Sequence, residues 1–305
     1  MKGELSWSNI LSGDYFREFQ ERQLLPVDAI PTPFPTWNRV CEDDGGGIGL
    51  PNGWLVLVGG NSGKGKTNLT LQLAVSALQA KGSAAYVSLE MSHRSLAQRF
   101  FAMASGMDVR DLSRGRFKQD VFQDAIARMW QKFPDAKFWT NEGTIHQTAK
   151  IIVQMDLLWN QGVDVFFVDY LQLIGLGDED EINRQVGESI SYLKDFCVTT
   201  NALVVCISQL NRTTASNIYD SPTKHGLLGG GVIEQAADQV ILLDHARYER
   251  LEDGSGARTW LILDKNRYGS EVQFPVFWSF KNLNAREGLP DEVDLWPKLR
   301  ERRGK

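Results

Sequence analysis

The residues with the clearest chemical role lie between Gly60 and Thr67. They read Gly-Asn-Ser-Gly-Lys-Gly-Lys-Thr, which fits the phosphate-binding P-loop pattern G-x-x-x-x-G-K-T. Glycines allow the backbone to curl so that successive N–H groups point at a phosphate, and the N-terminus of the following helix favours negative charge. Lys66 can reach the β- and γ-phosphates, and the Thr67 hydroxyl can ligate Mg²⁺. The residues predicted to bind a nucleoside triphosphate are Gly60, Asn61, Ser62, Gly63, Lys64, Gly65, Lys66 and Thr67.

The segments that flank this loop have the pattern that a P-loop requires. Trp54–Val58 is an apolar run typical of a buried strand, and Asn68–Gln79 carries apolar residues at helical spacing. A strand, a glycine loop and a helix in this order favour a nucleotide site over a glycine-rich turn that binds nothing.

Three polar residues follow predicted strands further along the chain. Asp169 comes directly after an apolar run and is predicted to hold Mg²⁺ together with the P-loop threonine. Glu90 is the candidate general base for water, and the amide of Gln209 could contact the γ-phosphate. Because the carboxyl ends of parallel strands gather around such a phosphate site, we expect these side chains near the P-loop. Each could instead be an ordinary cap, turn or helix-start residue.

Strands and helices alternate along the chain after residue 53. Continuous apolar strands that alternate with helices predict an α/β fold, with a mostly parallel twisted sheet and helices on both faces. The last three strands have no helices between them and are expected to form an antiparallel edge. The predicted strands are Ala84–Leu89, Val163–Val168, Leu203–Ile207, Val240–Leu243, Thr259–Leu263 and Val272–Phe277. The predicted helices are Ser95–Ser105, Val121–Phe133, Gln147–Trp159 and Gly187–Thr200.

The composition is that of an ordinary globular protein with 42% hydrophobic and 23% charged residues. The net charge of −5 argues against a surface that is basic everywhere. It does not exclude a local basic lining for nucleic acid, because phosphate contacts act at short range in salt. No apolar run is long enough to span a membrane. The three cysteines are far apart with no C-x-x-C pair, which suggests reduced thiols and a cytoplasmic location.

Both ends of the chain differ from its centre. Residues 1–50 are expected to form an arm and linker, in which Tyr15–Leu25 is an amphipathic helix candidate and prolines mark an extended stretch that follows it. Residues 51–285 are expected to form the nucleotide-binding domain, and residues 286–305 a charged tail. The acidic residues 178–181 are predicted to form a solvated loop.

The motifs together resemble the C-terminal motor domain of the DnaB-type replicative helicase family, which belongs to the RecA-like P-loop ATPases. They occur in the order of the family across residues 30–280. The matching segments are Gly60–Thr67, Ser88–Ser92, Val168–Leu173, Asn183–Gln185, Ser208–Arg212, Ile233–Asp238 and Lys265–Gly269.

The resemblance implies a specific set of roles. ATP and Mg²⁺ would be the ligands, with Lys66 and Glu90 as catalytic residues and Gln209 as a sensor of the γ-phosphate. Lys265 and Arg267 would act in trans on the γ-phosphate of a neighbouring subunit, where an inserted cation stabilises the transition state. Without the resemblance, two such basic residues are more often plain surface charges.

A trans contribution requires an oligomer, and the family forms hexameric rings around single-stranded DNA. The resemblance therefore implies a homo-oligomer, with the arm helix at Tyr15–Leu25 docked on the next subunit. A loader protein or primase is a further expected partner. The family's N-terminal helical collar, however, would not fit within residues 1–50.

One family motif departs from its usual form. The family often has L-R-E-S-G where this chain has Leu227–Gly231, so that Leu228 and Gly229 replace a basic and an acidic residue. Glycine N–H groups can still contact phosphate. The candidate DNA contacts are Arg184, Arg212, Lys224, Gly229 and Gly230.

Two functions remain open from the sequence. The first is a ring-forming, ATP-dependent DNA helicase motor that translocates on single-stranded DNA during replication. The alternative, suggested by the altered glycine segment, is a RecA-like regulatory or partner-binding ATPase that oligomerises without unwinding DNA. A recombinase filament agrees less well with the Ser88–Ser92 and Ser208–Arg212 motifs.

Overall fold

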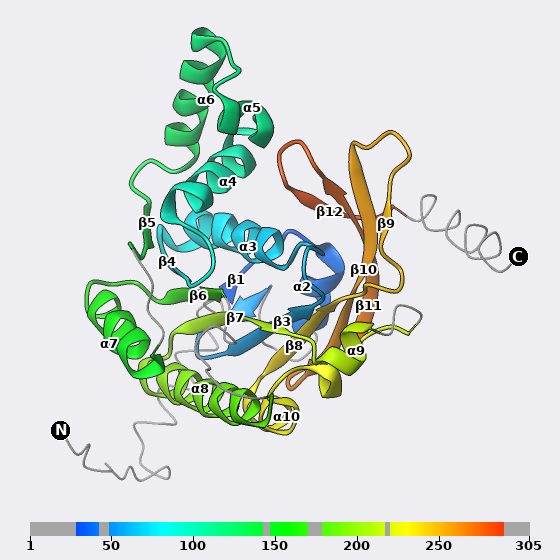
Figure 1. The fold of residues 1–305 in the computed structure, drawn as a ribbon. Coiled ribbons are helices and arrows are strands. Elements are labelled where there is room, and N and C mark those ends of the chain that lie inside the picture. Colours follow the sequence, from blue (N-terminus) through cyan, green and yellow to red (C-terminus); the bar gives the residue numbers. More distant parts are fainter. Residues whose placement is uncertain (1–28, 43–48, 143–146, 170–178, 217–219, 290–305) are drawn as a thin grey trace, which may run out of the picture.

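The computed structural model describes residues 29–42, 49–142, 147–169, 179–216 and 220–289. The arm helix expected at Tyr15–Leu25 and most of the predicted tail lie outside these residues. Within them, ten strands form one central sheet in the order β12-β11-β10-β8-β3-β7-β6-β4-β5, with β9 paired to β10 (Figure 1). None of the described helices is both long and apolar enough to cross a membrane.

One half of the sheet is parallel, as the alternating pattern predicts. Its strands pair in the order β8, β3, β7, β6, β4 and β5, and each neighbouring pair is parallel. The bounds are β3 Leu55–Gly60, β4 Ser83–Ser88, β5 Lys137–Thr140, β6 Val165–Asp169, β7 Leu203–Gln209 and β8 Gln239–Leu243. The short edge strand β5 was not among the predicted elements.

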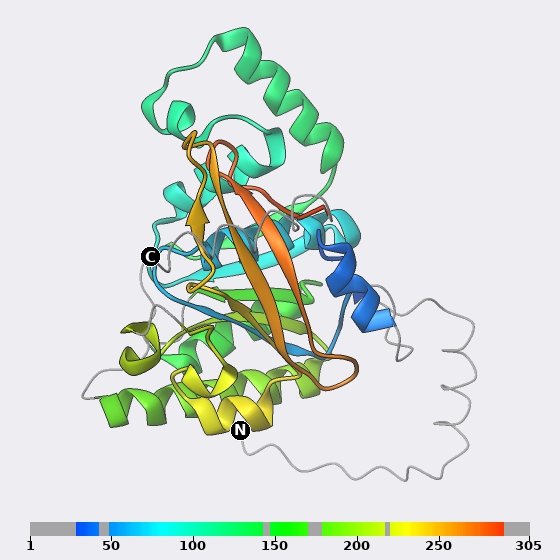
Figure 2. The same ribbon diagram turned by 90° about the vertical axis from the view of Figure 1, so that its right-hand side faces the viewer.

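The other half of the sheet is the expected antiparallel edge. In it, β10 (Gly256–Asn266) pairs with β8, with β11 (Val272–Ser279) and with the short β9 (Glu249–Arg250). The last strand, β12 (Ala285–Glu287), then pairs with β11. Figure 2 shows these long strands crossing one side of the molecule.

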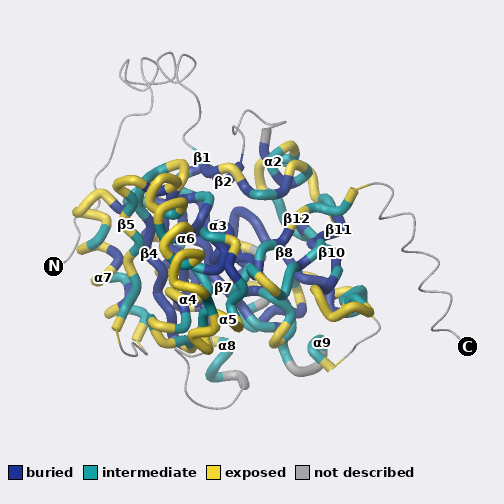
Figure 3. The backbone as a smooth tube through the Cα atoms, turned by 90° about the horizontal axis from the view of Figure 1, so that it is seen from above, coloured by how far each residue is buried: buried dark blue, intermediate teal, exposed yellow. Residues whose placement is uncertain are grey.

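Alternation along β3 explains why its residues are apolar without interruption. Val56 and Val58 belong to the core under α3 (Lys66–Lys81), whereas Leu55 and Leu57 belong to the core on the opposite face. Successive strand side chains point to opposite faces, so a sheet covered on both sides needs apolar residues at every position. The opposite face is covered by α7 (Thr148–Trp159), α8 (Glu179–Thr200) and α10 (Gly230–Ala236). The strands are accordingly buried at the centre of the molecule (Figure 3).

Three helices lie on the α3 face of the sheet, and they extend outward beyond α3. They are α4 (His93–Ser105), α5 (Val109–Arg114) and α6 (Gln119–Lys132), which project together in Figure 1. The side chain of Ser92 caps α4 by accepting a hydrogen bond from the N–H of Ser95, as N-cap serines do. The prediction contained α4 and α6 but not the short α5.

The segment before the P-loop strand is more ordered than the sequence predicts. Residues 29–30 and 50–51 pair as the short strands β1 and β2, and α2 (Pro35–Glu42) begins at a proline. Proline suits the first turn of a helix, where its missing N–H is not needed. Phe34 and Trp37 are fully buried. This segment therefore packs against the domain, and the expected extended stretch ends at Pro35.

The prediction of a solvated loop at residues 178–181 is wrong for its described part. Helix α8 begins at Glu179, eight residues before the predicted start at Gly187. Acidic residues are favourable in the first helical turn because of the helix dipole, and the run was misread because charge alone does not distinguish a loop from a helix start. The short α9 (Arg212–Ser216), the 3-10 helix η2 (Lys224–Gly226) and α10 were not predicted.

Candidate active site

The P-loop connects the carboxyl end of β3 to α3. Gly63 and Gly65 have positive φ angles of 70° and 103°, a conformation that strongly favours glycine. A Cβ atom at Gly65 would also lie 3.4 Å from the ring of Trp278. That distance is an ordinary van der Waals contact, so it is the backbone conformation that favours glycine at position 65.

Lys66 is buried inside this loop. Its Nζ donates hydrogen bonds to the carbonyl oxygens of Gly60 (2.7 Å) and Asn61 (2.9 Å). Burial lowers the pKa of Lys66 to about 8, although the carboxylates of Asp169 and Glu90 oppose the shift. The ammonium is thus held at the position where a P-loop lysine meets phosphate oxygens.

The predicted magnesium ligands contact each other directly. Thr67 Oγ1 donates to Asp169 Oδ2 at 2.8 Å, and the Tyr86 hydroxyl donates to the same oxygen at 3.0 Å. Burial raises the pKa of Asp169, while these two hydrogen bonds oppose that shift. A hydroxyl and a carboxylate side by side are the hard oxygen donors that Mg²⁺ prefers. The donor set therefore fits Mg²⁺.

The other predicted residues line the same cavity, which has a volume of about 430 Å³. Glu90 is exposed to it, and Gln209 is half-buried at its wall. Their positions follow from strand register, because Gln209 is paired with Gly60 and Ser88 with Asp169. The parallel sheet thus brings Lys66, Thr67, Glu90, Asp169 and Gln209 together at one edge, as expected.

Several residues of the cavity were not predicted. Tyr248, Trp278 and Phe280 give it an aromatic side, and Lys64 Nζ lies 3.9 Å from the centroid of the Tyr248 ring. Trp278 Nε1 is buried and has no hydrogen-bond partner among the described residues. Arg99 also lines the cavity, and its Nη1 donates to Asn68 Oδ1 at 2.9 Å. No local pattern marks these residues, because they come from helices and strands distant in sequence.

Lys265 and Arg267 lie outside this cavity. Lys265 pairs with Val240 near the start of β8, whereas the P-loop follows the other end of the adjacent β3. Lys265 Nζ donates to the carbonyl oxygen of Ala237 at 2.5 Å, and Arg267 Nη2 donates to that of Gln235 at 2.9 Å. Both side chains thus reach the C-terminal end of α10, away from the P-loop of their own chain.

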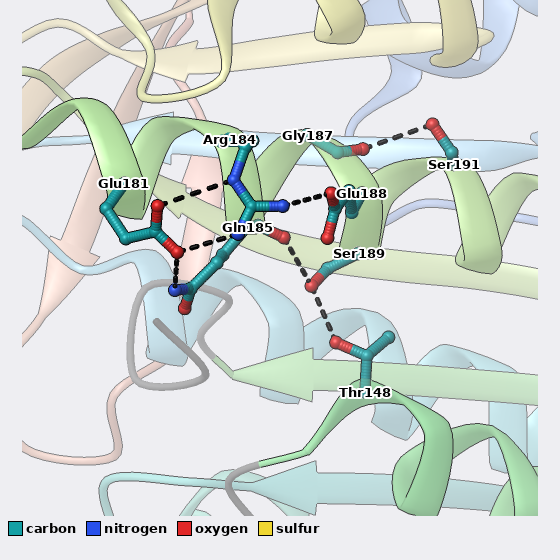
Figure 4. Close-up of polar contacts among 8 residues, drawn as sticks. All are labelled: Thr148, Glu181, Arg184, Gln185, Gly187, Glu188, Ser189 and Ser191. Carbon is teal, nitrogen blue, oxygen red and sulfur yellow. Dashed lines mark hydrogen bonds and ion pairs between the residues drawn. The ribbon is translucent and has the colours of Figure 1, made fainter. Parts of the chain in front are cut away.

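The candidate DNA contacts are dispersed and mostly engaged within the chain. Arg184 forms ion pairs with Glu181 (2.7 Å) and Glu188 on the exposed side of α8 (Figure 4). Lys224 Nζ donates to the carbonyl oxygen of Asp264 at 2.9 Å. Arg212 begins α9, and Gly230 begins α10.

Gly229 is the N-cap of α10 and packs closely against α8. It has a φ of 88°, and a Cβ there would lie 3.0 Å from Val186 Cγ1. Its N–H donates to Asn183 Oδ1 at 3.1 Å. The glycine that replaces the family's acidic residue is therefore required by backbone conformation and packing in this chain.

The fold and the cavity together define a RecA-like P-loop ATPase domain. The family model described as "DnaB-like helicase C terminal domain" matches residues 43–284. The chain belongs to this family.

Similar proteins support the assignment. A probable plasmid replicative DNA helicase of Chlamydia psittaci is 32% identical over 80% of this chain and 52% of its own length. The replicative DNA helicase DnaB of Helicobacter pylori is 29% identical over 75% of this chain and 46% of its own length. The chain thus spans about half the length of these relatives.

A solved structure of similar fold comes from a DnaB-like replicative helicase, described together with its interactions with primase. It has a TM-score of 0.75 and 17% sequence identity, and the match covers 90% of this chain and 68% of that one. This likeness supports the fold of the domain.

Proposed function

We propose that this chain is the ATP-hydrolysing motor of a ring-forming replicative DNA helicase that translocates on single-stranded DNA. The observation that carries the proposal is the single cavity that gathers Lys66, Thr67, Glu90, Asp169 and Gln209 in a DnaB-family domain. Nucleotide binding alone would need only the P-loop. A carboxylate exposed beside that loop adds the means to activate water.

Each of these residues has a defined task in the proposed reaction. The P-loop N–H groups and Lys66 bind the phosphates of ATP, and Thr67 and Asp169 hold the metal. When bound there, Mg²⁺ would supply positive charge that stabilises the charge on the phosphates. Glu90 orients the attacking water and accepts its proton, and Gln209 contacts the γ-phosphate.

The aromatic side of the cavity is proposed to receive the base. Aromatic rings offer flat faces on which a base can stack, and Tyr248, Trp278 and Phe280 line this side of the cavity. Lys64 of the P-loop lies over the Tyr248 ring, so this side of the cavity adjoins the P-loop.

Lys265 and Arg267 are proposed to complete the active site of a neighbouring subunit. Their position at the opposite end of the sheet from the P-loop supports action in trans. Such a head-to-tail contact repeats around a closed ring, which we propose is a hexamer. Different nucleotide states at successive interfaces would then move the DNA-binding loops relative to one another.

For the whole protein we further propose a cytoplasmic location and contact with a loader or primase. The primase contact is suggested by the solved relative that is described with its primase interactions.

The test is ATP hydrolysis by the purified protein with and without single-stranded DNA, together with unwinding of a forked duplex. We expect DNA to stimulate hydrolysis and binding to weaken as salt rises. DNA-independent hydrolysis without unwinding would instead favour a regulatory ATPase that oligomerises on its own.

A further inference from the structure

The basic residues proposed to act in trans are both anchored to the end of one short helix. Lys265 Nζ donates to the carbonyl oxygen of Ala237, and Arg267 Nη2 to that of Gln235, at the end of α10. Arg267 Nη1 also forms an ion pair with Asp238 Oδ1 at 3.2 Å. This carboxylate comes from the residue that joins α10 to β8, and no role in the proposed reaction has been assigned to it.

Asp238 is fixed more firmly than the cation it holds. Its side chain is 1% exposed, whereas that of Arg267 is 40% exposed. Its Oδ2 accepts hydrogen bonds from the N–H of Leu55 (2.8 Å) and from Lys194 Nζ (2.6 Å). A buried carboxylate requires such partners, and together they set its position relative to β3 and α8.

Backbone hydrogen bonds fix the same residue from two sides. The N–H of Asp238 donates to the carbonyl oxygen of Leu55 (2.9 Å), and the N–H of Arg267 donates to the carbonyl oxygen of Asp238 (2.9 Å). The residue after Arg267 is also held in place, because the Tyr268 ring stacks on that of Trp54 with the ring centroids 5.1 Å apart. The main chain at Arg267 therefore has little freedom, and its side chain is aimed by Asp238.

The contacts leave part of the guanidinium available. A guanidinium has five N–H donors, and the Asp238 and Gln235 contacts use two of them. The remaining donors can meet phosphate oxygens while one side stays on the protein. A cation oriented before its ligand arrives loses less side-chain freedom when the ligand binds.

We propose that Asp238 is the positioning residue of Arg267, holding its guanidinium in the orientation that meets the γ-phosphate bound by the neighbouring subunit. This inference rests on the proposed trans role of Arg267. Its consequence is specific. Loss of the Asp238 charge reduces the rate of the chemical step without weakening ATP binding, since the P-loop lies at the other end of the sheet.

The experiment compares Asp238→Asn with a matched control, Asp164→Asn, at another ion-paired aspartate, which directly precedes β6 and lies 3.7 Å from Lys81 Nζ. Asparagine keeps the shape and can still accept from the Leu55 N–H, but it lacks the charge that holds Arg267. We expect kcat for ATP hydrolysis to fall about tenfold to a hundredfold, with KM changed less than about twofold. Asp164→Asn makes the same change at a carboxylate that has no part in the proposed site, and it is expected to leave kcat within about twofold.

A second substitution separates positioning from stability. Asp238→Glu retains the buried charge but moves it by one methylene, so kcat should again fall while the protein stays folded. The proposal is wrong if Asp238→Asn or Asp238→Glu keeps full kcat, or if Asp164→Asn loses as much kcat as Asp238→Asn.

Mixed oligomers locate the defect. Asp238→Asn subunits have an intact P-loop, and Lys66→Ala subunits have intact trans-acting cations, so mixing the two should restore hydrolysis. An absence of recovery would place the defect in the subunit's own site and overturn the proposal.

Arg267→Ala separates the trans role of Arg267 from the positioning role of Asp238. Wild-type hydrolysis by this variant would remove the trans role itself. Impaired Arg267→Ala together with unimpaired Asp238→Asn would contradict only the positioning role.

Discussion

Lys66 combines burial with hydrogen bonds to two loop carbonyl groups, and its pKa is lowered to about 8 from the usual 10.5. A bound triphosphate would place negative charge beside the ammonium and raise this pKa again. Binding near pH 8 should therefore take up a proton, and affinity should fall as pH rises through 8.

Calorimetry of ATP binding between pH 7 and pH 9 tests this consequence. We expect the dissociation constant of the wild-type protein to rise across this interval, with proton uptake visible in buffers of different ionisation enthalpy. In Lys66→Arg the charge is permanent, so the pH dependence should disappear. An identical pH dependence in both proteins would contradict the assignment.

Glu90 is exposed to the cavity and lies two residues after the end of β4. If it activates water, Glu90→Gln should lower kcat by about 10²- to 10⁴-fold while ATP binding persists. Glu142→Gln is the matched control, because Glu142 is an exposed acid just beyond the end of neighbouring β5 and does not line the cavity. A steady-state ATPase assay decides between them, and unchanged kcat in Glu90→Gln would exclude this residue as the base.

Site residues can be predicted from the sequence when they belong to a known motif or when a polar side chain follows a predicted strand. Lys66 and Thr67 come from a motif, and Asp169 and Gln209 come from the rule that parallel strands end together. Tyr86 and Trp278 could not be found in this way. Tyr86 lies within β4 and reaches Asp169 across the sheet, and Trp278 comes from an antiparallel strand that returns to the P-loop. Their contributions depend on tertiary packing and have no local signal.

At the level of secondary structure, long periodic segments were predicted well and short ones were not. The strands that enclose the P-loop have apolar side chains on both faces, which is visible in sequence. Helix α10 spans only Gly230–Ala236 and begins with glycines, so neither length nor propensity marks it. Helix α2 was missed because a preceding series of prolines indicated extended chain, although Pro35 occupies a helix start.

Gly229 and Gly231, at the start of α10, allow a matched test of where this segment requires glycine. Gly229 has a φ of 88° and close contact with Val186, whereas a Cβ at Gly231 would meet nothing within 4 Å. Gly229→Ala should lower the free energy of unfolding by about 1–3 kcal/mol, through strain and overpacking. Gly231→Ala should raise it by about 0.5–1 kcal/mol, because alanine is the better helix former.

Urea unfolding of the two variants measures both effects. Equal changes in the two proteins, or stabilisation by Gly229→Ala, would show that the glycine at the N-cap is not required by this packing. The expected difference would explain why the family's charged residues cannot simply be restored at this position.

At the scale of the whole molecule, the sheet separates the two sets of side chains that are proposed to act in hydrolysis. The P-loop, Glu90 and Asp169 lie at the carboxyl ends of the parallel strands. Lys265 and Arg267 lie at the opposite end of the sheet, where Arg267 pairs with Asp238. Each set of residues belongs to its own sequence motif. Only the pairing of the strands shows that the two sets lie at opposite ends of the sheet. This separation supports an active site completed between subunits, which is the central claim of the account.

Mixing Lys66→Ala subunits with Arg267→Ala subunits tests that claim most directly. Each variant alone should hydrolyse ATP poorly, because one lacks the phosphate-binding lysine and the other the trans-acting arginine. In a random one-to-one mixture, about a quarter of the head-to-tail interfaces would combine an intact P-loop with an intact arginine, so about a quarter of the wild-type rate should return. Inactivity at every mixing ratio, with mixed oligomers verified, would contradict the shared site.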